Sequence, residues 1–298
     1  MAKLESKEQP MTRQIAVRMV GPSLLVSLFV VLTVATPESQ RPLRILVTND
    51  DGIESVGVQT LAQALRTVTD DIVVVAPDGN RSGSSHASAP GLLTVREFLD
   101  GDQSLGFGVS GFPADAVRFG LLELGRTRGF DLVVSGINRG ANVGDVAHLS
   151  GTVGAAMEAV YLGVPAIAVS QEASATDYQV SAAFTANLVE VLARQGMPQR
   201  VVLSVNVPSS IASEIAGVVA VPMGGSYLQT AAYERQDNTL GVPGLYRLRR
   251  ERRSDFTPGT DSHAYAEGLI TITPLRFDWT AEAMLSTIDG WKLSVPGQ

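Results

Sequence analysis

Five short apolar runs, separated by patterns of helical period, constrain the fold of this chain more than any other feature of its sequence. Each run is rich in Val and Ile and is bounded by turn residues; the runs cover residues 44–48, 72–76, 131–135, 166–170 and 201–206. Such runs are typical of strands buried on both faces of a sheet. Helical patterns lie between them at residues 58–68, 114–125, 152–162 and 182–195. This alternation predicts an α/β fold whose mostly parallel sheet carries helices on both faces.

The pattern of residues in the sequence changes from about residue 223. Turns multiply there, five arginines cluster between Arg247 and Arg253, and a strand-like run at 269–273 precedes a helical pattern near 280–288. We therefore predict a main domain at residues 43–222 and a C-terminal extension, made of a hairpin and a helix, at residues 223–298. Such an extension either embraces a partner subunit or covers the surface of a monomer, and the pattern leaves both open.

Residues 1–40 are interpreted as a targeting segment and not as part of the fold. Arg13 and Arg18 precede an uncharged apolar run from Leu24 to Ala35, and a polar stretch follows. A basic flank, an apolar stretch and small residues are the layout of a secretory signal. An uncleaved membrane anchor is the alternative, because the uncharged stretch approaches the roughly 17–20 residues that span a bilayer. We favour the export signal, and both interpretations place the folded domain outside the cytoplasm, in the periplasm or the extracellular space.

Composition excludes several classes of function. The formal net charge of −7 argues against a protein that coats a nucleic acid duplex, because such proteins need basic stripes. The chain has no cysteine, so disulfides, thiol catalysis and thiolate metal sites are excluded together. A metal site must therefore use oxygen or imidazole ligands, and the presence of only three histidines disfavours zinc.

Polar side chains follow three successive predicted strands. Asp50 and Asp51 come directly after the first, Ser82 lies in the loop after the second, and Asn138 follows the third. In open α/β sheets, ligands bind outside the carboxyl ends of the strands, near the point where the strand order reverses. We expect these side chains to point into one crevice.

The adjacent carboxylates Asp50 and Asp51 favour a bound cation. Like charges held close together are costly, because each raises the pKa of the other. With neutral oxygens from Ser82 and Asn138 they form an all-oxygen set that suits Mg²⁺, Mn²⁺ or Ca²⁺. The alternative is a plain turn with a helix N-cap, which Asp and Gly favour anywhere. The Ser82 and Asn138 loops, placed after equivalent strands, favour the metal site.

A second candidate feature is the predicted helix start at Ser150, Gly151 and Thr152. Free amides and two hydroxyls at such a start form an anion site, although the same residues also describe an ordinary capped helix. Beside a metal crevice, phosphate binding is the better interpretation. His86 lies in the Ser/Gly loop after Ser82; contact with a substrate phosphate, a role as an acid, and a solvated position all remain open for it.

The glycine pattern of residues 106–111 matches the dinucleotide-binding motif but is not interpreted as one. That motif must follow a strand, whereas residues 97–104 are polar and turn-like.

Taken in order, the motifs resemble the signatures of the SurE family of 5′/3′-nucleotidases. They are residues 49–52, 77–83, 111–115, 135–145, 150–153 and 270–275. The resemblance implies a Rossmann-like domain in which Asp50, Asp51, Ser82 and Asn138 hold one divalent metal ion. It also implies hydrolysis of nucleoside monophosphates and a homodimer or homotetramer built through the C-terminal extension. The predicted substrate-binding residues are Asn49, His86, Asn142, Ser150, Gly151 and Thr152.

Asp50 and Asp51 are the predicted catalytic residues. Either carboxylate would orient or deprotonate a water molecule that attacks phosphorus, and direct attack by the carboxylate is less favoured. Two other classes of function stay open: a calcium-dependent nucleoside N-glycosidase, and a nucleotide-binding protein without turnover. We expect contact with a membrane only through residues 1–40, if that segment is not cleaved.

Overall fold

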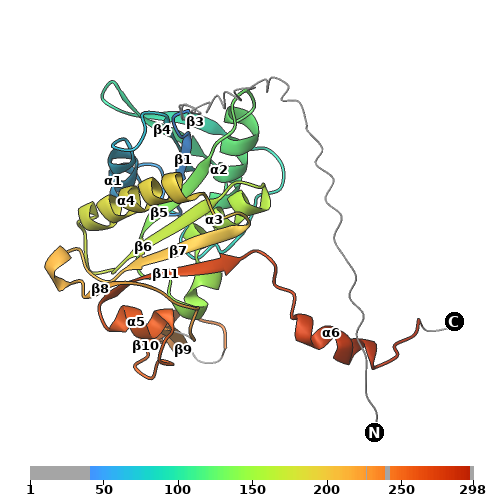
Figure 1. Cartoon of the computed structure of the whole chain (residues 1–298). Coiled ribbons are helices and arrows are strands. Elements are labelled where there is room, and N and C mark those ends of the chain that lie inside the picture. Colours follow the sequence, from blue (N-terminus) through green and yellow to red (C-terminus); the bar gives the residue numbers. More distant parts are fainter. Residues whose placement is uncertain (1–40, 226, 239–241, 296–298) are drawn as a thin grey trace, which may run out of the picture. The chain divides into compact units, whose positions relative to one another are not determined.

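The computed structural model describes residues 41–225, 227–238 and 242–295 (Figure 1). The predicted targeting segment lies outside these ranges. Within them, no helix is long and apolar enough to cross a membrane.

A nine-stranded sheet forms the centre of the fold, in the order β3-β4-β2-β1-β5-β6-β7-β11-β8. Its middle consists of the five predicted strands: β1 (Ile45–Thr48), β2 (Ile72–Pro77), β5 (Leu132–Arg139), β6 (Ala166–Gln171) and β7 (Val201–Val207). All neighbouring pairs among these five are parallel, and β1, β6 and much of β5 are fully buried. Burial on both faces explains why these strands read as continuous apolar runs. The predicted α/β fold is confirmed.

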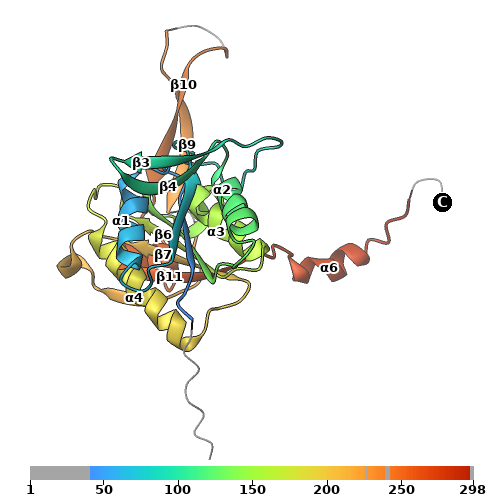
Figure 2. The same ribbon diagram turned by 90° about the horizontal axis from the view of Figure 1, so that it is seen from above.

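Four helices cover the sheet, two on each face (Figure 2). One face carries α1 (Val56–Leu65) and α4 (Gln179–Gln195), and the other carries α2 (Pro113–Phe119) and α3 (Gly151–Tyr161). Each pair of helices encloses its own apolar layer against the strands. Helix α3 is buried along almost its whole length, which explains its run of small residues. Small side chains let its backbone approach the sheet closely.

The strand order reverses between β1 and β5. From β1 the chain continues to β2 on one side, whereas β5, β6 and β7 follow one another on the other side. The carboxyl ends of β1 and β5 therefore flank the topological switch point, where ligands bind in open α/β sheets. Thr48 of β1 pairs with Ser135 of β5, immediately before the polar segments predicted to carry the site.

A hairpin at one edge of the sheet corrects the expectation that residues 97–104 form only a turn. Here β3 (Val95–Asp100) and β4 (Gln103–Val109) pair antiparallel, and β4 also pairs parallel with β2. Edge strands tolerate polar, exposed residues, and this hid the hairpin in the sequence. A Cβ atom on Gly106 would lie 2.4 Å from the Val74 carbonyl oxygen, so close packing accounts for this glycine.

The C-terminal extension contributes to the main sheet. Strand β11 (Leu269–Arg276) lies antiparallel to β7 and parallel to β8 (Gly217–Ala220), so the boundary expected near residue 223 does not separate two sheets. The same region forms a two-stranded sheet, β9 (Leu228–Arg235) with β10 (Tyr246–Arg252), and two helices, α5 (Asp261–Ala266) and α6 (Glu282–Asp289). The region past residue 113 also differs from the single helix expected there, because a π-helical turn (Gly120–Leu124) follows α2. Two 3-10 turns, Gly144–Leu149 and Ala212–Glu214, complete the elements.

Candidate active site

A cleft of about 280 Å³ opens beside the switch point of the sheet. Three of the four predicted metal ligands line it: Asp50 after β1, Ser82 after β2 and Asn138 at the end of β5. The fourth, Asp51, accepts a hydrogen bond from the Ser82 hydroxyl at 3.3 Å. The structure thus brings together side chains that are widely separated in the sequence.

Asp50 is the most constrained residue of the cleft. Only 2% of it is exposed, and the hydroxyl of Thr152 donates to its Oδ1 at 2.6 Å. The Thr152 backbone N–H stabilises the same carboxylate. Burial raises the pKa of Asp50 above its ordinary value; the Thr152 hydroxyl opposes this shift, and the charge of Asp51 adds to it. Hydrogen bonds therefore hold the carboxylate in one place, although burial makes its ionised form unfavourable.

Asp51 joins the loops after three strands. Its Oδ1 accepts from Ser82 and also from Asn80 Nδ2 at 3.2 Å, and its Oδ2 lies 3.4 Å from the backbone nitrogen of Arg139. Asn138 donates its amide nitrogen to the Gly140 carbonyl at 2.7 Å, which leaves its side-chain oxygen to face another partner.

These residues fit a hard divalent cation. The set contains two carboxylates, one hydroxyl and one amide oxygen, the ligand types that Mg²⁺, Mn²⁺ and Ca²⁺ prefer. Neither Asp50 nor Asp51 forms an ion pair with a cationic side chain in the described part of the chain. The hydroxyl of Ser84, two residues after Ser82, is buried there without a hydrogen-bond partner. Among the described residues, no group of three or more His, Cys, Asp or Glu side chains is placed to hold a metal ion, so a site here depends on neutral oxygens as well.

At the start of α3, both hydroxyls predicted to bind a phosphate have partners within the chain, and their contact with substrate stays a prediction. Thr152 gives its hydroxyl to Asp50, and the Ser150 hydroxyl caps the helix by accepting from the Val153 N–H at 3.2 Å. A Cβ atom on Gly151 would lie 2.7 Å from the Asp50 Cβ, so only glycine allows this approach. A carboxylate already occupies the position that the helix dipole makes favourable for an anion. Ser150 still lines the cleft.

The other predicted substrate residues have separate surroundings. Asn142 lines the cleft and donates to the Ser170 hydroxyl at 2.8 Å. Asn49 bonds to Gly52 and Ser55 and so shapes the turn after β1. The roles proposed for these residues toward substrate stay predictions.

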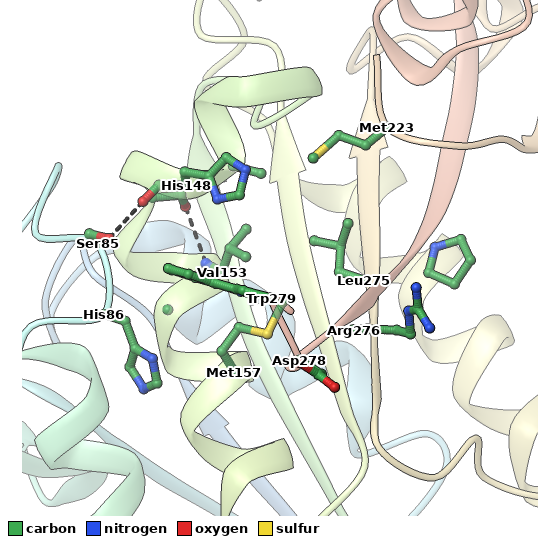
Figure 3. Close-up of a pocket in the computed structure, with 14 residues that line it drawn as sticks. Ser85, His86, His148, Val153, Met157, Met223, Leu275, Arg276, Asp278 and Trp279 are labelled. Carbon is green, nitrogen blue, oxygen red and sulfur yellow. Dashed lines mark hydrogen bonds between the residues drawn. The ribbon is translucent and has the colours of Figure 1, made fainter. Parts of the chain in front are cut away.

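His86 faces a second cavity of about 290 Å³ that His148, Met157 and Trp279 also line (Figure 3). Its Nε2 lies 2.8 Å from Glu158 Oε2, so the ring already has a partner. The contact of His86 with substrate stays a prediction as well, and this geometry does not favour it.

Two arginines of the cleft were not predicted. Arg139 follows Asn138, and Arg250 comes from β10 of the C-terminal hairpin together with Thr230 of β9. Arg250 pairs with Thr230 directly after an irregularity in the register, and such bulges redirect side chains. Arg249 and Arg252 form ion pairs with acidic residues, whereas Arg250 forms none within the described ranges. The arginine cluster was visible in the sequence, but nothing there placed it at the cleft.

Comparison with known proteins identifies the family. Residues 45–230 match the family model described as Survival protein SurE. The chain belongs to the SurE family. It is 40% identical over 259 residues to 5′-nucleotidase SurE of Geobacter sulfurreducens, which covers 85% of this chain and 95% of that protein. It is 39% identical over 260 residues to 5′/3′-nucleotidase SurE of Escherichia coli, covering 85% and 98% of the two chains.

A solved structure of a SurE protein agrees with this fold. The crystal structure of the SurE protein from Aquifex aeolicus superposes with a TM-score of 0.73 at 31% identity. The match covers 84% of this chain and all of that one, so the Rossmann-like SurE fold extends over nearly the whole described region.

The raised pKa of Asp50 predicts how its replacement affects stability. The folded state disfavours the charged carboxylate, so ionised Asp50 lowers the free energy of unfolding at neutral pH. Metal-free Asp50→Asn should therefore melt higher than the wild type at pH 7, by about 2–4 °C for each kcal/mol relieved. The difference should shrink as the pH falls through the raised pKa, because the wild-type carboxyl then becomes neutral. Thermal unfolding in chelator at several pH values measures this, with the exposed Asp102→Asn as the control. A lower melting temperature for Asp50→Asn at pH 7 would contradict the assigned cost.

Proposed function

We propose that this SurE protein is a divalent-metal-dependent nucleotidase that converts nucleoside monophosphates to nucleoside and inorganic phosphate. The observation that carries the proposal is the convergence of Asp50, Asp51, Ser82 and Asn138 at the switch point of the sheet. The names of the relatives from Geobacter sulfurreducens and Escherichia coli support the reaction class.

The four converging residues would hold one cation, with Asp50 and Asp51 supplying its negative ligands. When bound, a divalent cation supplies electrostatic stabilisation of the charge that develops on the phosphoryl oxygens. Asp50 is the fixed carboxylate of the pair, because Thr152 holds one of its oxygens. In this proposal the Asp50 carboxylate orients the attacking water and takes its proton. The water oxygen bonds to phosphorus as the ester P–O bond breaks, and the leaving oxygen takes a proton from solvent at the open mouth of the cleft.

The outer cleft fits a phosphate ester with an organic leaving group. Arg139 and Arg250 place two guanidinium-bearing side chains beside the carboxylates, and guanidinium groups bind phosphate oxygens well. Val146 and Leu149 form an apolar wall on which a nucleoside can lie. A small anion therefore finds local positive charge within an acidic protein.

Phosphate release tests the reaction. After chelation, the wild type should release phosphate from a panel of nucleoside 5′- and 3′-monophosphates only when Mg²⁺, Mn²⁺ or Ca²⁺ is added back. Asp51→Asn should reduce turnover by more than about 100-fold, beyond the loss typical when a residue that only supports a metal ligand is replaced. Asp102→Asn, an equivalent change at an exposed turn, should keep wild-type rates. Release of free base with the phosphate retained would indicate an N-glycosidase. Metal-dependent nucleotide binding without turnover would indicate a binding protein. Either result would overturn the nucleotidase proposal.

We also propose that the protein is a homodimer held by its C-terminal arm, residues 277–295. The arm follows β11 and carries α6 (Figure 1). All residues of α6 are exposed. Its apolar side chains face solvent in a single chain: Trp279, Met284, Leu285, Ile288, Trp291, Leu293 and Val295. A contiguous set of this kind marks an interaction surface. We propose that the arm binds a second copy of this chain. The base of the arm already packs on the chain's own α3, where Phe277 stacks on Tyr161.

The arm predicts the effect of charge on assembly. Replacing both Leu285 and Ile288 with Glu should convert the dimer to a monomer in light scattering coupled to size-exclusion chromatography. Buried interface positions do not tolerate unpaired charges. Ser286→Glu, on the polar side of the same helix, should leave the dimer intact. A wild-type monomer, or a dimer that survives the double substitution, would refute the role of the arm.

Finally, we propose that residues 1–40 direct export of the chain. Cleavage should follow the small residues near Ala35, so N-terminal sequencing of the protein recovered from a bacterial periplasm should begin shortly after that position. An intact N-terminus in the membrane fraction would indicate the anchor instead, and recovery only from the cytosol would contradict both.

A further inference from the structure

A buried charged cluster fastens the Ser82 loop to the helices behind the cleft. At its centre is Glu158 of α3, whose side chain is 3% exposed. Glu158 Oε2 lies 2.8 Å from His86 Nε2, and its Oε1 accepts from Arg118 of α2 at 2.8–2.9 Å. His86 and Arg118 together lower the pKa of Glu158 against the opposing effect of burial, which is the largest single influence on it. The carboxylate is thus a stable acceptor for the imidazole.

A second set of bonds extends the cluster along the loop. The Asp115 carboxylate accepts from the Ser88 hydroxyl at 3.0 Å and from the Ala89 N–H at 2.8 Å. Arg118 also donates to Ser88 at 2.9 Å. The loop is therefore attached to α2 and α3 through His86, Ser88 and Ala89.

The loop backbone also packs on α3 and on the 3-10 turn that precedes it. The Ser85 hydroxyl donates to the His148 carbonyl of that turn at 2.6 Å (Figure 3). The Ser85 N–H donates to the Leu149 carbonyl at 3.2 Å. A Cβ atom on Gly154 would lie 2.2 Å from the Ser85 carbonyl oxygen. Any side chain at residue 154 would push the loop outward.

These contacts connect the two halves of the proposed metal site. Helix α3 holds Asp50 through Thr152, and the loop presents Ser82 to Asp51. The position of Ser82 relative to Asp50 is therefore set by how the loop is seated on α3. We propose that His86 is a positioning residue that, through Glu158, fixes the Ser82 loop for metal binding. The inference rests on the proposed metal site. It assigns His86 no contact with substrate.

The attachment through His86 has the properties of a positioning contact. Its side chain is 28% exposed and forms one polar contact, and Glu158 keeps Arg118 when His86 is removed. Loss of the imidazole should therefore loosen the loop, which keeps its bonds through Ser85, Ser88 and Ala89, without leaving an uncompensated buried charge. Metal affinity should fall more than global stability.

Calorimetric titration of Mn²⁺ into the metal-free full chain tests the proposal. His86→Ala should bind Mn²⁺ about 10-fold more weakly, the lower end of the loss seen when a residue that supports a metal ligand is removed. Its melting temperature in chelator should remain close to that of the wild type. His86→Gln should restore most of the affinity, because its amide N–H can donate to Glu158. His148→Ala is the matched control: His148 lines the same cavity, and the variant keeps the backbone carbonyl that Ser85 contacts.

Gly154→Ala gives an independent test that leaves every charge in place. Alanine favours a helix over glycine, so helix propensity alone predicts a more stable protein. We expect the variant to bind Mn²⁺ more weakly despite this effect on the helix, because the new methyl group displaces the Ser85 carbonyl.

The outcomes separate the two proposals. A wild type that binds no Mn²⁺ overturns the metal site and the positioning role with it. A wild type that binds Mn²⁺, together with His86→Ala and Gly154→Ala variants of unchanged affinity, overturns the positioning role alone. An equal loss in His148→Ala also overturns it, because the effect would then belong to the cavity and not to the bond with Glu158.

Discussion

The contact between Thr152 and Asp50 is the interaction on which the arrangement of the cleft depends. A buried carboxylate needs donors, and the first turn of α3 supplies a hydroxyl, a backbone N–H and the positive end of a helix dipole. Gly151 must lack a side chain for this approach, because a Cβ there would overlap Asp50. The start of α3 and the end of β1 therefore constrain each other, and the remaining polar groups of the site are arranged around this fixed charge.

The electrostatics of the cleft are unbalanced without a ligand. Asp50 lines it and Asp51 follows directly in the chain; neither carboxylate has a cationic partner in the described part of the chain, and Arg139 and Arg250 also line the cleft. The proposed cation would relieve the first imbalance, and the phosphate of the proposed substrate would provide an anion for the second. Each charge compensates the other, so metal and phosphate ester are expected to bind better together than separately. The net charge of the whole chain does not show this pattern, because the opposite charges are separated by only the width of the cleft and cancel in the sum.

The sequence predicted the central fold well because burial on both faces leaves an unmistakable apolar run. It predicted the meeting of Asp50, Asp51, Ser82 and Asn138 because strand ends of a parallel sheet share one edge. The edge hairpin of β3 and β4 was missed, since half-exposed strands carry no such run. Arg250 was missed because its place in the cleft depends on a bulge and on how β10 packs, and no local pattern records either. The hydrogen bond from Thr152 to Asp50 could not be predicted for the same reason. A helix start has the same sequence pattern whether it binds a phosphate or a carboxylate.

The C-terminal extension contributes to the candidate site. Asp261 of α5 is 2% exposed and accepts backbone N–H groups from Gly144, in the loop after β5, and from Gly224. Burial raises the pKa of Asp261 despite these bonds. Its ionised form is therefore disfavoured in the folded state, as is that of Asp50. Val143 packs with Tyr227 and Tyr265 beside it. The loop that carries Asn142 is therefore fixed by residues of the C-terminal extension, which are distant from it in the sequence. Because β10 brings Arg250 from the same region, the cleft is complete only when the extension is folded against the sheet.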